Sequence, residues 1–273
     1  MTVYVITHKQ FNELYPRDGY RKLLVGAKKS RKNIPVNEQE SFLFDDTGDN
    51  ISNQNDSFCE LTGLYWIWKN VHSNDNVGIV HYRRYFGKYS ATFWGKVCEY
   101  LTGIMGKQLQ IIPTQVLDDL LDTYDAVVTN NQATASYGIP EMVWQEYANA
   151  HYLHDLEVTR DVIVSRFPEY EEEFYQVVHG NRYHHYNMMY TTRSNFDQYC
   201  EWLFSILFEV KQRINIDQYD SYQQRVFGFL SERLMDVWLF HNNLHLKELR
   251  VLKAENTDDL DVRIRIKRRF SQK

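Results

Sequence analysis

The chain has few cysteines and no long apolar run, and these absences exclude several classes of protein. Its three cysteines, Cys59, Cys98 and Cys200, form no C-x-x-C pair, so neither a zinc site nor a redox motif is indicated. An odd, low count suits a reducing compartment, and we expect a cytoplasmic protein. No run of about 18 apolar residues is present, so no membrane span is expected. The N-terminus lacks the pattern of a signal peptide.

Excess positive charge and the common phosphate-binding and hydrolase motifs are also missing. A net charge of −5 and a pI near 6.1 create no overall basic field, so we expect no nucleic-acid partner. The absence of G-x-x-x-x-G-K-[ST] and G-x-G-x-x-G disfavours nucleoside-triphosphate hydrolysis and the usual dinucleotide site. Without G-x-S-x-G, a serine hydrolase is also disfavoured. Aromatic residues, in contrast, make up 15% of the chain. Clefts rich in them suit sugar rings and bases, although most of these residues will belong to the core.

Strands and helices alternate in the first half of the sequence, and helices dominate the second half. Apolar, β-branched runs predict strands over 3–7, 22–27, 76–84, 124–130 and 184–193. Residues 28–56 are polar and irregular, which predicts a long loop. The spacing of apolar residues predicts helices over 57–72, after Pro113, within 140–178, and over 194–214 and 219–242. This order favours an α/β fold with a mostly parallel central sheet and a helix-rich C-terminal half.

No repeat, low-complexity tract or linker rich in glycine, serine or proline divides the chain. We therefore expect one domain over residues 1–260, followed by a basic tail over 261–273. The tail interleaves apolar residues with Arg263, Arg265, Lys267, Arg268 and Arg269. Such a segment can lie on an anionic membrane, which predicts peripheral contact with the inner face of the plasma membrane. A solvated tail or an edge strand explains the same pattern equally well.

A run of polar and aromatic residues, H-Y-R-R-Y at 81–85, forms the end of the strand predicted over 76–84. Ligands of open α/β sheets bind beyond the carboxyl ends of the strands, so we expect Thr7, His8 and Lys9, after the first strand, to meet this run. Arg83 and Arg84 offer forked donors that suit a phosphate or a diphosphate, and His81 and Lys9 add positive character. Tyr82 and Tyr85 suit stacking on a base or a sugar.

Structural explanations compete with each of these roles. Arg83 and Arg84 can pair with carboxylates such as those of residues 45, 46 and 49. Alternation along a strand would also point the two arginines to opposite faces of the sheet, so that at most one of them reaches a ligand. A hydrogen-bonded core histidine explains His81 as well as a ligand role does.

Three groups of carboxylates raise separate possibilities. Asp45, Asp46 and Asp49 lie in the predicted loop, where they can bind Mg²⁺ together with a nucleotide. The segment 57–60 fits the capping box S-x-x-E, which assigns Glu60 to the start of the helix over 57–72. Glu232, next to an arginine, stands inside an apolar helix. It is either half of an internal salt bridge, the commoner case, or a site carboxylate with a shifted pKa.

Six blocks of the sequence resemble a bacterial family found at capsule and exopolysaccharide biosynthesis loci, whose members are described only as a domain of unknown function or as glycosyltransferases. The blocks are YVITHK, DDTGDNIS, CELTGLYWIWKN, GIVHYRRYF, YNMM and GFLSERL. The resemblance extends from about residue 3 to residue 240. The order of elements also resembles a GT-A glycosyltransferase, in which a D-x-D at the end of a central strand holds a metal and the nucleotide diphosphate. Here GIVHYRRYF takes the place of that motif.

The resemblance implies a glycosyltransferase that uses a UDP-sugar, with galactose or galactofuranose as the transferred sugar. The implied acceptor is a growing surface polysaccharide or a lipid-linked oligosaccharide. Because no D-x-D ends the central strand, no metal ligand is assigned and the need for Mg²⁺ or Mn²⁺ is left open. Positive side chains would neutralise the leaving diphosphate instead.

These considerations assign a role to each candidate residue. The donor site is expected to comprise Thr7, His8, Lys9, Asp46, Thr47, Asp49, Asn50, His81, Arg83, Arg84 and Tyr85. Glu232 is the first candidate for the general base that an inverting enzyme needs, and Asp46 is the second. We expect His185, Asn187 and Arg233 on the acceptor side.

Two functions of other classes fit the same residues. A non-catalytic partner in polysaccharide assembly, which binds a sugar nucleotide or a polysaccharide, would bind UDP without turning it over. A Mg²⁺-dependent phosphatase or nucleotidyltransferase would use the aspartate loop. That enzyme would lose more function from Asp46→Asn than from Arg84→Ala.

Overall fold

The computed structural model describes residues 1–16, 18–90, 93–105, 108–136, 139–261 and 263–264. Its centre is an eight-stranded sheet with the order β11-β6-β12-β5-β4-β1-β2-β3, in which β11 also pairs with β4. The strands are β1 (Thr2–Thr7), β2 (Tyr20–Leu24), β3 (Phe42–Phe44), β4 (Val77–His81), β5 (Arg84–Ser90), β6 (Ala126–Thr129), β11 (Met189–Thr191) and β12 (Leu246–Lys253).

Most of the sheet is parallel. Strand β1 pairs in parallel with β2 and β4, β2 with β3, and β12 with β6. Strand β11 runs antiparallel to both β4 and β6, and β5 runs antiparallel to β4 and β12. The predicted α/β fold with a mostly parallel sheet is therefore confirmed.

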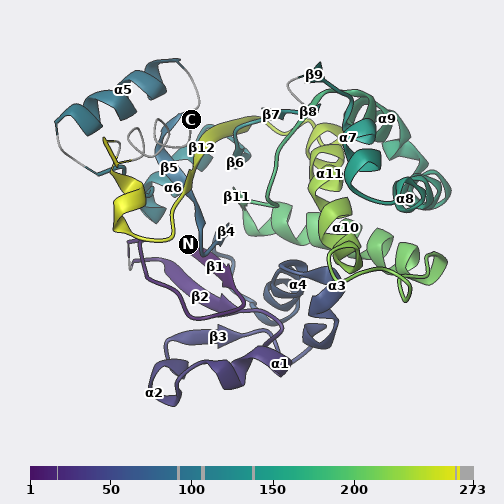
Figure 1. The fold of residues 1–273 in the computed structure, drawn as a ribbon, viewed down its shortest axis with the longest axis horizontal. Helices are drawn as coiled ribbons and strands as arrows, with labels where there is room; N and C mark the ends of the chain where they lie inside the picture. Colours follow the sequence, from purple (N-terminus) through teal and green to yellow (C-terminus); the bar gives the residue numbers. More distant parts are fainter. Residues whose placement is uncertain (17, 91–92, 106–107, 137–138, 262, 265–273) are drawn as a thin grey trace.

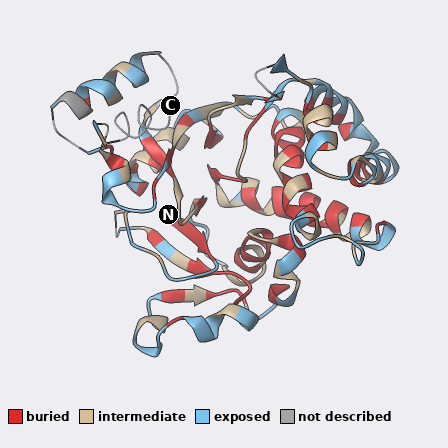
Figure 2. Cartoon of the chain, viewed as in Figure 1, coloured by how far each residue is buried: buried red, intermediate tan, exposed pale blue. Residues whose placement is uncertain are grey.

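Both faces of the sheet are covered, as a parallel sheet requires. Along β1, Tyr4 and Ile6 belong to one core, while Val3 and Val5 belong to a second core on the opposite face. Figure 2 shows the buried residues gathered along the central strands and along the long helices α10 and α11.

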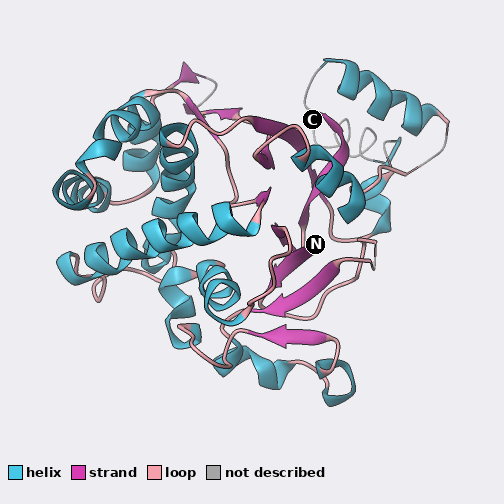
Figure 3. Cartoon of the chain, turned by 180° about the vertical axis from the view of Figure 1, so that it is seen from behind, coloured by secondary structure: helices cyan, strands magenta, loops and turns pink. Residues whose placement is uncertain are grey.

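The C-terminal half is rich in helices, as the sequence predicts. Helices α7 (Val143–Ala150), α8 (Leu153–Arg166), α9 (Glu171–His179), α10 (Arg193–Arg213) and α11 (Val226–His241) form one lobe beside the sheet. Helix α5 (Phe93–Ile104) and the short helix η5 (Thr257–Leu260) lie at the opposite side of the molecule (Figure 1 and Figure 3). Helix α6 (Thr114–Leu121) follows Pro113, as expected.

The prediction of a long loop over 28–56 is wrong. This segment contains the edge strand β3 and the short helices α1 (Ala27–Ser30), α2 (Val36–Gln39) and α3 (Asn55–Phe58). Its organising residue is Asp45, which is fully buried. The Asp45 carboxylate accepts hydrogen bonds from the backbone N–H groups of Gly26 and Ala27 and from the hydroxyls of Ser52 and Thr62. Because both oxygens of this carboxylate already accept hydrogen bonds from the protein, Asp45 is not available to bind a cation.

The single helix predicted over 57–72 is two helices, α3 and α4 (Leu61–Asn70), and the predicted capping box is absent. Cys59 separates the two helices with φ of 51° and ψ of −127°, a positive-φ conformation that ends α3. Ser57 lies in α3 and donates to the carbonyl of Gln54. Helix α4 packs closely on the sheet, because a Cβ at Gly63 would lie 2.8 Å from Ile6 Cδ1. Because the capping box is absent, the carboxylate of Glu60 is not used to cap a helix and is available for another contact.

The strand predicted over 76–84 is a hairpin. Strand β4 ends at His81, and β5 begins at Arg84, with which His81 is paired. Both arginines therefore lie at a turn, and the expectation that alternation along one strand would separate them does not apply.

Much of the predicted basic tail, residues 262 and 265–273, lies outside the described residues. Arg263 is described and pairs with Asp261. Among the described residues, no helix has both the length and the apolar character to cross a membrane.

Candidate functional site

A cleft of about 880 Å³ lies at the carboxyl ends of β1 and β4. Its main lining comes from the segment that ends β1, the β4–β5 hairpin, the α3–α4 junction, the segment 183–186, and the segment 221–225 with the start of α11. Val25, after β2, and Glu146 and His151, in and just after α7, complete it. This volume is within the range of about 300–1,000 Å³ that small-molecule sites occupy, and the position is the usual one for ligands of open α/β sheets.

The β4–β5 hairpin contributes four consecutive residues to the cleft, His81, Tyr82, Arg83 and Arg84. The guanidinium of Arg83 donates to Glu255 Oε1 at 2.7 Å. That of Arg84 lies 4.5 Å from the centre of the Tyr186 ring, and no ion pair joins it to a carboxylate in the described part of the chain. Arg84 is thus the hairpin cation that is free to bind an anion.

The two histidines at the mouth of the strands do not add positive charge near neutral pH. Burial lowers the pKa of His81, whose Nε2 lies 2.6 Å from the Tyr186 carbonyl oxygen. The neutral imidazole therefore donates from Nε2–H to that carbonyl. Burial, reinforced by Lys9 and Arg83, also lowers the pKa of His8. The expectation that His81 helps to neutralise a diphosphate is corrected accordingly.

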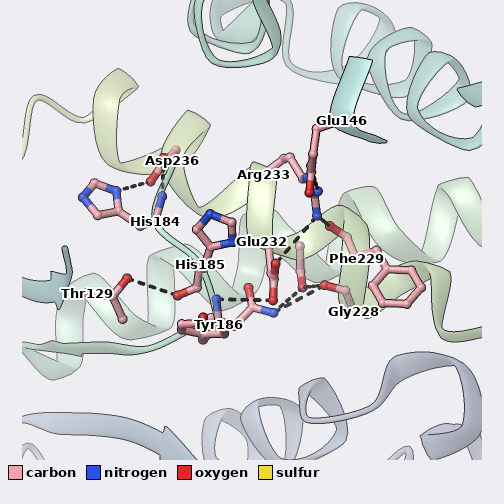
Figure 4. Close-up of polar contacts among 12 residues, drawn as sticks. Thr129, Glu146, His184, His185, Tyr186, Gly228, Phe229, Glu232, Arg233 and Asp236 are labelled. Carbon is pink, nitrogen blue, oxygen red and sulfur yellow. Dashed lines mark hydrogen bonds and ion pairs between the residues drawn. The ribbon is translucent and has the colours of Figure 1, made fainter. Parts of the chain in front are cut away.

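Glu232 lies on α11 and faces the cleft, with 21% of its side chain exposed. Burial raises the pKa of its carboxyl group to about 7, the nearby carboxylate of Glu60 adds to this, and Arg233 opposes it. The backbone N–H of Tyr186 donates to Glu232 Oε1 at 3.3 Å (Figure 4). A carboxylate that gains and loses a proton near pH 7 is suited to general-base catalysis.

Arg233, the neighbour of Glu232, is almost fully buried and lines the wall of the cleft. Its Nη2 donates to Glu146 Oε2 and its Nη1 donates to the carbonyl of Phe229, while Glu232 Oε2 is 3.7 Å away (Figure 4). The strong pair is therefore Arg233 with Glu146. Glu232 keeps the raised pKa that a closer pairing with Arg233 would abolish.

Asn187 does not line the cleft but holds a carboxylate that does. Its Nδ2 donates to Glu60 Oε1 at 2.7 Å and to Ser231 Oγ at 2.8 Å. It thereby connects the start of α4 to α11 beneath the cleft. Tyr186 and Asn187 have φ of 82° and 49°, so this turn stores backbone strain where it meets the cleft.

His185 lines the cleft, as expected for the acceptor side, and stacks on Tyr183 with ring centres 3.9 Å apart. Burial lowers its pKa to about 4, with smaller effects from Arg233 and Lys253. The imidazole is neutral near pH 7, so it offers hydrogen bonds to hydroxyl groups without a charge.

Asp236 anchors the strained turn from behind the cleft. It is fully buried, and it accepts from the backbone N–H of His184 at 3.0 Å and from His184 Nδ1 at 2.5 Å (Figure 4). Glu248 lies 3.6 Å from His184 Nε2. Burial alone would lower the pKa of His184, but the two carboxylates outweigh it and raise the pKa to about 9. His184 is therefore a buried cation. Its pair with Asp236 holds the backbone in place directly before His185.

The buried pair of His184 and Asp236 makes the stability of the protein depend on pH. The pKa of His184 rises from its ordinary value of 6.5 to about 9 on folding. The pair therefore contributes fully below pH 6.5, and the contribution is lost as pH rises through 9. We expect Asp236→Asn to lower the free energy of unfolding by about 3–5 kcal/mol near pH 6 and to remove this part of the pH dependence. Urea denaturation across this pH range measures both effects. Asp161→Asn, which breaks an exposed pair with Arg160, is the control and should change little.

Several predicted donor-site residues lie elsewhere. None of the segment 46–50 lines the cleft. Asp46 pairs with Arg31 at 3.6 Å, Asn50 donates to the carbonyl of Gly48, and Asp49 and Thr47 contact Tyr65 and Trp66 of α4. Asp46 is therefore not placed to act as a base. Tyr85 is fully buried in the core and donates to the Tyr82 carbonyl.

The residues after β1 are divided between two hollows. Thr7 and His8 line the cleft, whereas Lys9 lines a neighbouring hollow of about 300 Å³ together with Tyr82 and Arg83. The Thr7 hydroxyl accepts from the backbone N–H of Lys9 and shapes this turn.

The donor atoms at the end of β4 do not fit a divalent metal. Two guanidiniums, one phenol and one imidazole stand where a D-x-D would supply carboxylates, and guanidiniums attract anions. In the described ranges, no group of three or more His, Cys, Asp or Glu residues is arranged to hold a metal ion.

Sequence patterns missed several residues of the cleft. Glu60 fitted a capping box, so its partner Asn187, 127 residues away along the chain, was not foreseen. Tyr183, Glu146, His151 and Arg225 also line the cleft. They belong to separate elements, and no local spacing connects them. The aromatic content of the chain was a general signal for Tyr183, and no sequence pattern marked Glu146, His151 or Arg225.

Comparison with known proteins gives two results. The structure is similar to that of the WbbM bifunctional glycosyltransferase in its apo form, with a TM-score of 0.77 and 26% sequence identity. The alignment covers 93% of this chain and 45% of that one, so this chain spans less than half the length of WbbM. The likeness supports the GT-A-like fold that the sequence predicts. No functionally curated protein matches the chain.

The second result concerns the family. A family model matches residues 2–243, the region that holds all six blocks described above. The chain therefore belongs to the family described as the domain of unknown function DUF4422.

Proposed function

We propose that this chain is a glycosyltransferase that uses a nucleotide-diphosphate sugar. One observation carries the proposal: a carboxylate with a pKa of about 7, Glu232, and a cation that no carboxylate of the described residues pairs with, Arg84, line the same cleft at the carboxyl ends of β1 and β4. A base for an acceptor hydroxyl and a cation for a leaving diphosphate are the two groups that an inverting sugar transfer needs. The likeness to the WbbM bifunctional glycosyltransferase supports the same conclusion.

The proposed step is a direct displacement at the anomeric carbon. Glu232 takes the proton of the acceptor hydroxyl while the oxygen of that hydroxyl forms a bond to the anomeric carbon. The bond from that carbon to the diphosphate oxygen breaks, and its electron pair leaves with the diphosphate. Arg84, with Arg83 beside it, stabilises the negative charge that develops there. His185 lies on the acceptor side as a neutral hydrogen-bonding group.

We further propose UDP-galactose or UDP-galactofuranose as the donor, and a surface polysaccharide or a lipid-linked oligosaccharide as the acceptor. The family resemblance of the six blocks is the support for this choice. The low cysteine count favours the cytoplasm, and the basic residues of the C-terminal segment favour the inner face of the plasma membrane, where lipid-linked acceptors are found.

Release of UDP from a panel of UDP-sugars tests the proposal. We expect slow release from one donor alone and faster release when an oligosaccharide acceptor is added. Asp46→Asn is a matched control that should not change the rate, because Asp46 lies outside the cleft. Binding of UDP with no release from any donor would instead identify a non-catalytic binding partner. A larger loss from Asp46→Asn than from Arg84→Ala would favour a phosphatase or nucleotidyltransferase.

A further inference from the structure

Three aromatic side chains that the proposed step does not use form one cluster in the lining of the cleft. Tyr222 directly precedes the short helix η4 (Gln223–Arg225), Phe229 lies on α11, and His151 follows α7. The ring centres of His151 and Phe229 are 3.9 Å apart, and those of Tyr222 and Phe229 are 5.2 Å apart. We call Tyr222, Phe229 and His151 the aromatic platform.

Hydrogen bonds hold the platform in position. His151 Nδ1 lies 3.1 Å from Gln223 Oε1, and Gln223 Nε2 donates to the Ala150 carbonyl at 2.8 Å. The Asp220 carboxylate accepts from the backbone N–H groups of Tyr222 and Gln223. The Tyr222 side chain is nevertheless 52% exposed. An open aromatic ring on a fixed backbone is preorganised for a ligand, because binding has little left to order.

The groups around the platform indicate a neutral, polar ligand. Ser221 and Gln224 line the cleft beside the rings and supply a hydroxyl and an amide. Burial lowers the pKa of His151, so its ring is uncharged near pH 7. A sugar presents a face of C–H groups and a rim of hydroxyls. It therefore fits aromatic faces that neutral hydrogen-bonding groups surround.

The cation beside the platform, Arg225, already has partners within the protein. Its Nε donates to Cys59 Sγ at 3.3 Å, and its guanidinium carbon lies 5.5 Å from the centre of the Phe229 ring. The other N–H groups of a guanidinium can donate to sugar hydroxyls as well as to anions. Arg225 is thus compatible with a neutral saccharide, and the dependence of binding on salt distinguishes the two kinds of ligand.

The platform begins one helix turn from the proposed base. Phe229 and Glu232 stand at positions i and i+3 of α11, so their Cβ atoms are about 5–6 Å apart on one face of the helix. Figure 4 shows Phe229 on the side of Glu232 that is away from His185 and Tyr186. The donor residues, in contrast, come from the β4–β5 hairpin and the end of β1. A sugar chain whose hydroxyl reaches Glu232 can therefore continue over the platform.

We propose that the aromatic platform binds the second sugar residue of a neutral oligosaccharide acceptor. This inference rests on the proposed function, because Glu232 defines where the reacting hydroxyl lies. The first acceptor sugar presents its hydroxyl to Glu232, and the next ring packs its C–H face on Tyr222. An acceptor of two or more sugars is then bound more tightly than a single sugar. The platform thereby selects existing sugar chains over free monosaccharides.

Saturation-transfer difference NMR of the whole chain with saccharides tests the proposal without a donor or turnover. The probes are methyl glycosides of mono-, di- and trisaccharides that contain galactose, glucose, mannose, rhamnose or N-acetylglucosamine. In at least one series, we expect the dissociation constant of the disaccharide to be about tenfold lower than that of the monosaccharide, because a second ring leaves water. Tyr222→Ala should remove this advantage, and Tyr222→Phe, which keeps the ring, should retain most of it. High salt should leave the binding unchanged.

Tyr175→Ala is the matched control. Tyr175 lies on α9, does not line the cleft, is 59% exposed and also stacks on a histidine, His179, with ring centres 3.9 Å apart. This variant should bind every probe as the wild type does. Calorimetry with UDP and the release of UDP from donors report separately on the proposed function. A disaccharide preference that Tyr222→Ala removes would support the platform even if no donor were turned over.

Four results would overturn the proposal. The first is a wild-type protein that binds none of the probes, or binds the disaccharide no more tightly than the monosaccharide. The second is a Tyr222→Ala protein that keeps the preference. The third is a Tyr222→Ala protein that loses binding of uridine, because the base would then occupy the platform. The fourth is saccharide binding that high salt abolishes, which would indicate an anionic ligand drawn to Arg225.

Discussion

Replacing Glu232 by Gln is expected to lower the rate of sugar transfer by about 10²- to 10⁴-fold, the contribution that a positioned general base makes. Glutamine keeps the size of the side chain and an oxygen for the Tyr186 N–H, so the turn at 186–187 should be retained. Binding of UDP should change little, since Glu232 is assigned to the acceptor. Initial rates of product formation and calorimetry with UDP measure the two quantities.

The pH profile adds a second readout to the same variant. Because the pKa of Glu232 is about 7, the wild-type rate should rise as pH increases through 7 and level off above it. Glu232→Gln should lack this step. Glu60→Gln is the matched control, because Glu60 is the neighbouring carboxylate of the cleft and is held by Asn187. We expect it to lose less than about tenfold. A Glu232→Gln enzyme with a wild-type rate would contradict the assignment.

Replacing Arg84 by Ala is expected to weaken UDP binding by about 10- to 100-fold. The basis is the loss of a charge-assisted hydrogen bond to the diphosphate, which contributes about 1.5–3 kcal/mol. Uridine, which has no phosphate, should bind the variant and the wild type about equally if it binds at all. Isothermal titration calorimetry with UDP and uridine separates the two contributions, and measurements in EDTA and in Mg²⁺ show whether a metal takes part.

Arg83→Ala provides the comparison on the same hairpin. Arg83 also lines the cleft, but its guanidinium is paired with Glu255, so its loss should weaken UDP binding less than the loss of Arg84 does. Equal losses would show that the Glu255 pair opens when ligand binds. An Arg84→Ala protein that binds UDP as the wild type does would remove the diphosphate site from the hairpin.

The sequence predicted the architecture well where apolar runs were long. Residues 3–7 and 194–214 form β1 and α10 close to the expected limits, because continuous burial leaves a clear pattern. Strand β3 was missed because only three residues, F-L-F, form it, at the edge of the sheet. The hairpin after His81 was read as one strand because no glycine or asparagine marks its turn.

The candidate site was predicted in part. The segments after β1 and β4 do reach one cleft, as the rule for the carboxyl ends of parallel strands requires, and Glu232 joins them from α11. The aspartate loop does not reach the cleft, because four donors from the flanking segments converge on the buried Asp45 carboxylate and make the loop a structural element. Glu60 shows the opposite case, since a local capping pattern concealed a contact with the distant Asn187.

A crystal structure of the wild-type protein with bound UDP is the most direct test of the central claim, that this cleft holds a nucleotide diphosphate between the hairpin and α11. We predict that the diphosphate contacts the Arg84 guanidinium and that the nucleotide lies along Thr7 and His8. The end that would carry the sugar should face Glu232. UDP bound in another hollow, such as the one lined by Lys96 and Lys253, or in this cleft without contact to Arg84, would contradict the account.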